Sequence, residues 1–125
     1  MKLEYLSEGS PDCPLIRLYR FTQEEALRLR AIVNELSNGH LQYLALHIQP
    51  GIEPIDECQL LMKRDKLDQG IVQRAPRRFE CVLSEAGWRD VSLLLEPFCE
   101  TDTRGFQWLV EKGPISLLIS AKGTW

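Results

Sequence analysis

The sequence predicts an α+β fold: a two-layer sandwich in which one six-stranded, mostly antiparallel sheet carries two helices on one face. Three observations predict it. Two amphipathic segments follow good helix-starting residues, six short runs have the composition of strands, and the order strand–helix–strand–strand occurs twice as a tandem βαββ pseudo-repeat. At 125 residues the chain fits a single domain, 1–125, with half-repeats at about 13–65 and 78–122 and a charged linker at 64–78.

The first half begins with a strand at residues 15–21, which is rich in branched and aromatic side chains and follows a proline. Thr22 and Glu25 then form a capping box, in which each side chain satisfies an amide at the start of a helix. Apolar residues recur at helical spacing up to the stop signal Asn38-Gly39. The pattern therefore predicts a helix with one buried face.

Two further strands complete the first half. Residues 41–48 carry apolar side chains on both faces, which suggests a central position in the sheet. Residues 49–57 contain two prolines and a glycine and are typical of a loop, and residues 58–63 form the next strand. We interpret the polar stretch that follows as a linker with one short strand at Ile71-Val72.

The second half repeats the order. Residues 79–83 predict a strand, and Ser84 is a suitable N-cap for a helix that ends near Leu95, because Pro97 disfavours helix at the residue before it. Strands follow at 106–111 and 115–121, joined by a Lys-Gly-Pro turn.

An internal alignment matches the two halves. At an offset of 62 residues the N-caps Thr22 and Ser84 coincide, and four apolar helix positions fall on apolar partners. With two gaps, residues 41–45 meet 106–110 and residues 60–62 meet 117–119. The repeat predicts a pseudo-twofold axis and one uncovered sheet face; chance similarity between apolar strands is the alternative.

At the level of element order, the run from about Leu15 to Ala121 resembles the tandem modules of GyrI-like small-molecule-binding domains. The resemblance implies a ligand held between the two halves and assigns no particular binding residue. Glyoxalase and bleomycin-resistance domains duplicate a similar unit with one more strand per half. The second half here has no room for that strand, and the His/Glu metal ligands of those enzymes are not evident.

Charge and composition restrict the classes of molecule that this protein is expected to bind. The net charge of −3 and the pI near 5.4 argue against nucleic acid, and no apolar run is long enough to span a membrane. The N-terminus is too acidic for a secretory signal, so we expect a cytoplasmic protein with reduced cysteines. Residues 63–78 carry +4, which suggests either a site for an anionic ligand or acidic partner, or a solvated linker.

The sequence offers little support for catalysis. The only histidines, His40 and His47, lie around one strand on opposite faces, so they cannot share a metal there. No Cys-x-x-Cys, glycine-rich phosphate loop or nucleophile motif occurs, and nothing near Cys81 in the sequence would activate its thiol. We therefore predict no catalytic residue, metal or cofactor, and we favour a non-catalytic role over enzyme activity.

Three functions remain open. In the first, a small-molecule-binding or regulatory module has a pocket at the pseudo-twofold seam, lined by some of the residues Tyr19, Tyr43, Trp88 and Trp108, with Gln42 and Gln107 at equivalent repeat positions. In the second, the uncovered aromatic sheet face forms a homodimer or binds another protein. In the third, the chain is an enzyme whose site is dispersed along the sequence.

Overall fold

The computed structural model describes all 125 residues, Met1–Trp125. The helices are α1 (Gln23–Asn38) and α2 (Glu85–Leu95), with single 3₁₀ turns at Leu46–Ile48, Ile55–Glu57 and Glu96–Cys99. The strands are β1 (Lys2–Leu6), β2 (Leu15–Tyr19), β3 (Tyr43–Ala45), β4 (Glu53–Pro54), β5 (Gln59–Arg64), β6 (Gly70–Ala75), β7 (Arg78–Leu83), β8 (Phe106–Val110) and β9 (Ser116–Ser120).

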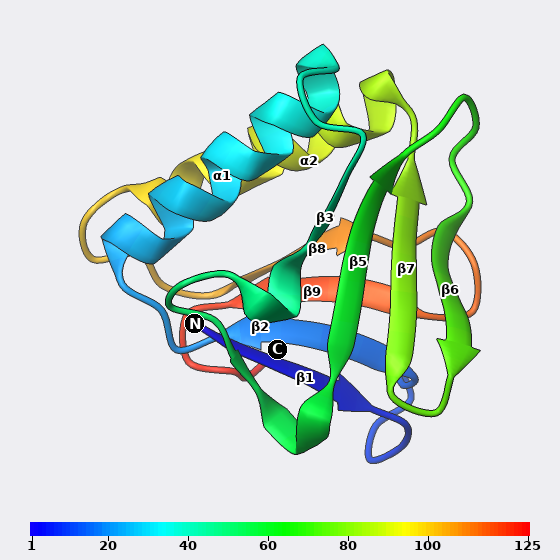
Figure 1. Cartoon of the computed structure of the whole chain (residues 1–125). Helices are drawn as coiled ribbons and strands as arrows, with labels where there is room; N and C mark the ends of the chain where they lie inside the picture. Colours follow the sequence, from blue (N-terminus) through cyan, green and yellow to red (C-terminus); the bar gives the residue numbers. More distant parts are fainter.

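The fold class α+β is confirmed, but the single six-stranded sheet is wrong. The nine strands form two mixed sheets: sheet A has the order β4-β1-β2-β9-β8, and sheet B has the order β3-β5-β7-β6. In Figure 1 the strands of sheet A are roughly horizontal and those of sheet B are roughly vertical. The two helices pack across the open side between the two sheets. The predicted two-layer sandwich is therefore wrong: sheet A, sheet B and the helix pair enclose the core from three sides.

The helices explain why there are two sheets. Helix α1 leads from β2 in sheet A to β3 in sheet B, and α2 leads back from β7 in sheet B to β8 in sheet A. In each sheet the two central strands are parallel, β2 with β9 and β5 with β7, and each pairs antiparallel with its other neighbour. Each sheet therefore contains strands from both halves of the chain.

Helices α1 and α2 pack against each other in opposite directions. Ser37, near the end of α1, donates its hydroxyl hydrogen bond to the carbonyl oxygen of Glu85 at the start of α2 (3.4 Å). At the other end of the pair, the Gln23 amide donates to the carbonyl oxygen of Cys99 (2.9 Å). Arg30 bridges the middle by donating from Nε to the Ser92 carbonyl oxygen at 3.1 Å.

The predicted helix ends are confirmed. Thr22 and Glu25 form both hydrogen bonds of the capping box, and α1 ends at Gly39 in the left-handed conformation with φ of 86°. Ser84 caps α2 by accepting from the amide of Gly87 at 3.1 Å. Regular helix stops at Leu95, and Pro97 lies in the 3₁₀ turn that follows.

One hydrophobic core of 26 buried residues fills the space between the helices and the inner faces of both sheets. Phe79 of β7 and Trp88 of α2 are its largest fully buried side chains. The Trp88 indole donates to the carbonyl oxygen of Lys63 at 2.9 Å, so its one polar group is satisfied inside the core. Neither helix combines the length and apolarity that crossing a lipid bilayer requires.

Three strand predictions need correction. Residues 64–78, interpreted as a linker with one short strand at Ile71-Val72, contain the six-residue strand β6 at Gly70–Ala75. Strand β1 at the N-terminus was not predicted at all. The strand expected over 41–48 is only three residues long and lies at an edge, because the chain turns at Leu46, which is fully buried, and His47 accepts a hydrogen bond from the amide of Leu60 (3.1 Å).

Candidate functional site

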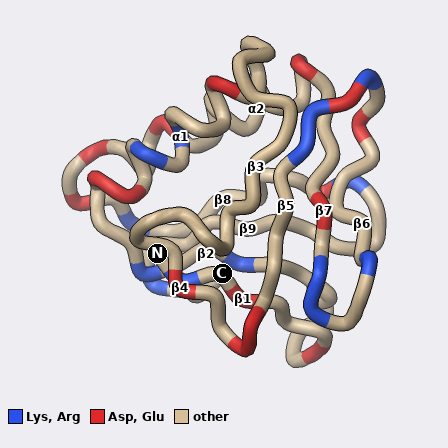
Figure 2. Tube along the Cα trace, in the orientation of Figure 1, with Lys and Arg blue, Asp and Glu red and all other residues tan.

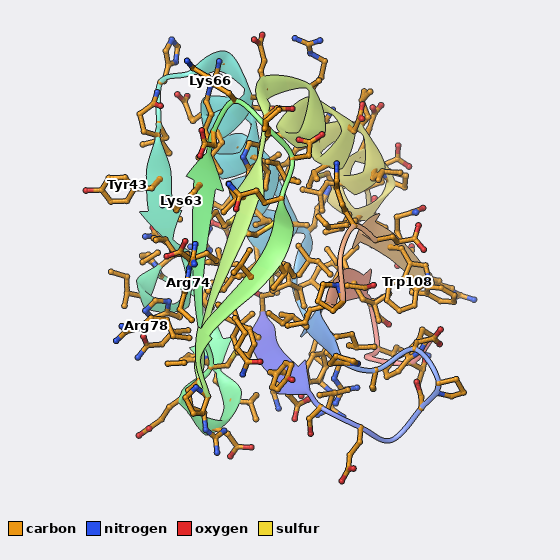
Figure 3. All side chains as sticks on the ribbon, turned by 90° about the vertical axis from the view of Figure 1, so that its right-hand side faces the viewer. Tyr43, Lys63, Lys66, Arg74, Arg78 and Trp108 are labelled. Carbon is orange, nitrogen blue, oxygen red and sulfur yellow. The ribbon has the colours of Figure 1, made fainter.

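The six residues proposed to line a seam pocket lie in different places. Trp88 is in the core. Tyr43 lies on the outer face of sheet B, and Trp108 projects from the other side of the molecule, on the outer face of sheet A (Figure 3). Gln42 precedes β3, where its amide donates to the carbonyl oxygen of Gly39 at 3.2 Å.

The ladder registers also separate the two glutamines. Tyr43 lies opposite Lys63, and Phe106 lies opposite Ser120, at the start of β3 and β8 respectively. By this register Gln107 corresponds to Leu44, two residues away from the match that the sequence alignment gave. Buried side chains of the hydrophobic core lie between the two sheets at this point.

The chain's own C-terminal tail covers the part of the outer face of sheet A around Tyr19 and Arg17. Gly123 lies so close to Tyr19 that a Cβ atom on it would be 2.9 Å from the aromatic ring, and its carbonyl oxygen accepts from Arg17 at 2.6 Å. The Arg17 guanidinium lies over the Tyr19 ring and also pairs with Glu4 at 2.6 Å. Tyr19 is consequently only 7% exposed and donates its hydroxyl hydrogen bond to Glu4.

This enclosure affects the ionisation of Tyr19. Burial, followed by the hydrogen bond to the Glu4 carboxylate and the charge of that group, raises the pKa of Tyr19, and the nearby Arg17 opposes the rise. The side chain is therefore held neutral and engaged within sheet A. Tyr19 therefore has a structural role within sheet A.

The outer face of sheet B has no such cover. We call it the basic face and define it by seven of the side chains on this side of β3, β5, β7 and β6, namely Tyr43, Leu61, Lys63, Val72, Arg74, Arg78 and Glu80; Ala45, Gln59 and Val82 lie on the same side. Tyr43 is 66% exposed. Figure 2 shows basic residues along β5, β6, β7 and their turns, which is the segment that the sequence marked as positive.

Glu80 lies at the centre of the basic face and organises it. Its carboxylate is close to Lys63 (3.7 Å) and Arg74 (3.2 Å), and its own side chain is only 16% exposed. Arg78 has no carboxylate partner and donates only to the amide oxygen of Gln59 at 3.4 Å. Three basic side chains against one acid leave the surface positive, with the charges spread along the strands.

A polar surface cavity of about 690 Å³ lies above the basic face, between the end of β5 and the start of α2. Its charged groups already serve the fold. Arg64 donates to the carbonyl oxygens of Leu36 and Ser37 at the end of α1, and Glu85 pairs with Arg64 at 3.5 Å and with Arg89 at 3.0 Å. Three of the charged residues that line the cavity, Arg64, Glu85 and Arg89, are therefore already paired within the chain.

At the start of α2, Asp68 is also engaged within the chain, through hydrogen bonds from Ser84. Its carboxylate accepts from the backbone amide of Ser84 at 2.7 Å, and hydrogen bonds from Ser84 hold the pKa of Asp68 below its ordinary value despite partial burial. A carboxylate at a helix N-terminus also interacts favourably with the helix dipole. This end of α2 is occupied by a side chain of the chain itself.

A second cavity, of about 320 Å³, is more apolar and borders the free edge of β6. It is formed by residues from β6 and just before it, by Tyr5 of β1, and by residues of the segments that lead into β2 and β9. The lining residues are Tyr5, Pro14, Gln69, Ile71, Val72, Gln73, Pro114 and Ile115. Lys112 approaches the start of β6 so closely that a Cβ atom on Gly70 would lie 2.2 Å from its carbonyl oxygen. The turn between β8 and β9 thus closes one end of this groove.

The residues with catalytic potential do not converge. No group of three His, Cys, Asp or Glu side chains is placed to hold a metal ion. All four cysteines are free thiols; burial raises the pKa of Cys58 to about 11 and that of Cys81 to about 12. His40 is exposed beside Glu35, and His47 is engaged with the backbone of β5.

Comparisons with protein-family models, with curated proteins and with solved structures found no match for this chain. The functional argument therefore rests on the surface geometry of the two sheets.

Proposed function

We propose that this chain is a non-catalytic protein-interaction module that binds an acidic segment of a partner protein on the basic face of sheet B. One observation carries the proposal. Around Tyr19 and Arg17 the outer face of sheet A is covered by the tail of the chain, whereas the outer face of sheet B presents an exposed tyrosine and three basic side chains.

The chemistry of the basic face favours acidic side chains on an extended protein segment. Glu80 holds Lys63 and Arg74 in defined positions, and Arg78 has no carboxylate of this chain within ion-pair distance. A single aromatic side chain, Tyr43, provides apolar contact area at one border. Nucleic-acid platforms generally combine several stacking aromatics with a larger positive field, so a protein partner fits this surface better.

A solution titration tests the proposal. Fluorescence anisotropy with a labelled, blocked octapeptide of glutamates should show binding that weakens as salt is raised, because exposed charge pairs are screened. The double variant Lys63→Glu/Arg78→Glu should lower the affinity by about tenfold or more. The matched control is Arg104→Glu/Lys122→Glu, which makes the same charge change at exposed positions outside sheet B.

Two results would overturn the proposal. One is an equal loss of affinity in the control variant, because the effect would then be one of net charge alone. The other is tighter binding of a labelled single-stranded oligonucleotide than of the acidic peptide under the same conditions, which would identify a nucleic-acid surface.

We also propose that the two halves are copies of one unit, β1-β2-α1-β3-β5 and β6-β7-α2-β8-β9. What supports this is connectivity: replacing each element of the first unit by its counterpart converts the order β1-β2-β9-β8 into β6-β7-β5-β3, with the same parallel and antiparallel pairs. Only β4, which pairs with β1, has no counterpart.

A further inference from the structure

The two corresponding edge strands differ in what lies beside them. In sheet A, β4 pairs with β1 in parallel, placing Glu53 beside Lys2 and Pro54 beside Leu3. The amide of Glu53 donates to the carbonyl oxygen of Met1 at 2.8 Å, so backbone hydrogen bonding attaches this extended segment to the edge. In sheet B, the counterpart strand β6 is terminal, and no segment of the chain pairs with its outer side.

The edge of β6 separates two surfaces of different chemistry. Ile71 and Gln73 lie opposite Cys81 and Phe79, whose side chains are buried in the core, so they share the inner side of sheet B with the 320 Å³ groove. Val72 lies opposite Glu80 on the basic face, and Arg74 reaches the same carboxylate. One side of the edge is therefore mainly apolar and the other is positive.

If a strand were added at this edge, every second side chain would face the apolar groove and the others would face the positive surface. Side chains alternate between the two sides of a strand, and added strands combine backbone hydrogen bonds with contacts from alternate side chains. We propose that the outer edge of β6 accepts an extended segment of the partner protein as a fifth strand of sheet B, with apolar side chains toward the groove and acidic side chains toward Arg74. This inference rests on the proposed function, for which it supplies the mode of binding.

A partner segment fits this edge better than a second copy of the chain does. Pairing of β6 with another β6 would bring two positively charged strands together, with an Arg74 on each and Arg77 and Arg78 just beyond. Like charges on adjacent strands are destabilising, whereas acidic side chains would be attracted there. The in-chain example, β4 on β1, likewise places an acid, Glu53, near a base, Lys2, at 3.9 Å.

Peptides that differ in pattern and in backbone test the inference. The probe is a blocked, labelled octapeptide with alternating valine and glutamate, compared with a block peptide of four valines and four glutamates. Two further versions carry N-methyl groups on the odd or on the even residues, which removes the amide donors of one strand edge. We expect about tenfold weaker binding for the block peptide and for one of the methylated versions.

Backbone amide NMR spectra of the protein locate the site. The alternating peptide should shift the amide signals of residues 71–75 more than those of β3 at the opposite edge. The variant Arg74→Glu should weaken binding by about tenfold, and the control Arg104→Glu should not. Shifts confined to β3 and β5, or equal binding of all four peptides, would overturn the strand-addition site.

The failure of this inference can be told apart from failure of the proposed function. If all acidic peptides bind equally and the Lys63→Glu/Arg78→Glu variant still weakens them, the basic face binds acids without adding a strand. If none of the peptides binds, both proposals are overturned. A dimer detected by light scattering whose formation shifts the amides of residues 71–75 would assign the edge to a second copy and overturn the partner segment.

Discussion

Arg30 of α1 donates a hydrogen bond from Nε to the carbonyl oxygen of Ser92 of α2, and each of these residues lies eight positions after the N-cap of its helix. When two antiparallel helices are related by a twofold axis, equivalent residues of the two helices face each other where the axis passes between them. Arg30 and Ser92 are such a pair. The contact thus supports the proposed duplication with a geometric observation that is independent of strand order.

The same contact predicts a stability effect. Replacing Arg30 with methionine keeps most of the side-chain length but removes the bond to the Ser92 carbonyl oxygen at the helix interface. We expect the free energy of unfolding in urea to fall by about 1–2 kcal/mol. The control is Arg28→Met, which removes only an exposed pair with Glu24 on the same helix and should change stability by about 0.5 kcal/mol or less. Equal losses in the two variants would contradict a bridging role for Arg30.

Gly70 should be among the least replaceable glycines. Its φ is 76°, and a Cβ atom would be 2.2 Å from the backbone oxygen of Lys112. Gly105 has a similar φ of 84° but nothing within 4 Å of its Cβ position. Gly105→Ala should therefore cost only the backbone strain, about 1 kcal/mol, and Gly70→Ala about 2 kcal/mol more, because the turn between β8 and β9 must move. Thermal unfolding of both variants measures the difference.

Asp68 should account for part of the fall in the free energy of unfolding at acidic pH. Because its pKa is lowered in the folded state, its contribution to stability is present above the unfolded pKa, near 4, and is lost as the pH falls through the lower folded value. Asp68→Asn should reduce the free energy of unfolding at pH 7 by about 1–2 kcal/mol and flatten its decrease below pH 4.

Urea titrations at a series of pH values measure this effect. Glu25 contributes a second acidic transition that Asp68→Asn leaves in place. Its burial raises the pKa, but hydrogen bonds from the N-terminal ammonium group and from Thr22 outweigh this and lower it. A variant whose stability keeps the full wild-type pH dependence would contradict the role assigned to Asp68.

The cysteines should differ in reactivity toward a thiol reagent at pH 8. Three of the four thiols are buried, and burial raises the pKa of Cys58 and Cys81 to about 11 and about 12, so few of them are thiolates. Cys13 is only partly buried. We expect one rapidly reacting thiol per folded chain, lost in Cys13→Ser, and reaction of all four in guanidinium chloride. Rapid modification of a second thiol would show that the core opens locally.

The elements that depend on near neighbours were predictable from the sequence. The capping box of Thr22 and Glu25, the stop at Gly39 and the end of α2 near Leu95 are set within a few residues and are confirmed. Strand β1 carries a usable signal that was missed: Lys2 and Glu4 alternate with Leu3 and Tyr5, and Leu3 is fully buried. Only the Ile71-Val72 part of strand β6 was predicted, because Gln73 and Arg74 are polar and exposed at an edge.

The division into two sheets was not predictable, because it depends on pairs such as Leu15 with Ser116 that are far apart in the chain. The same holds for the site. Tyr19 and Tyr43 look equivalent as strand tyrosines, but Tyr19 is covered because Gly123 returns across its ring. The positive segment 63–78 was visible in the sequence; its placement on one uncovered sheet was not.

Because each sheet contains strands from both halves of the chain, a single cleavage between the halves would divide both sheets. Cleavage between Lys66 and Leu67, in the exposed turn before β6, would yield two fragments, each holding a hairpin of sheet A or B, a helix, and a hairpin of the other sheet. Neither fragment alone could close the core, so each would have to recruit the other as a complementing subunit.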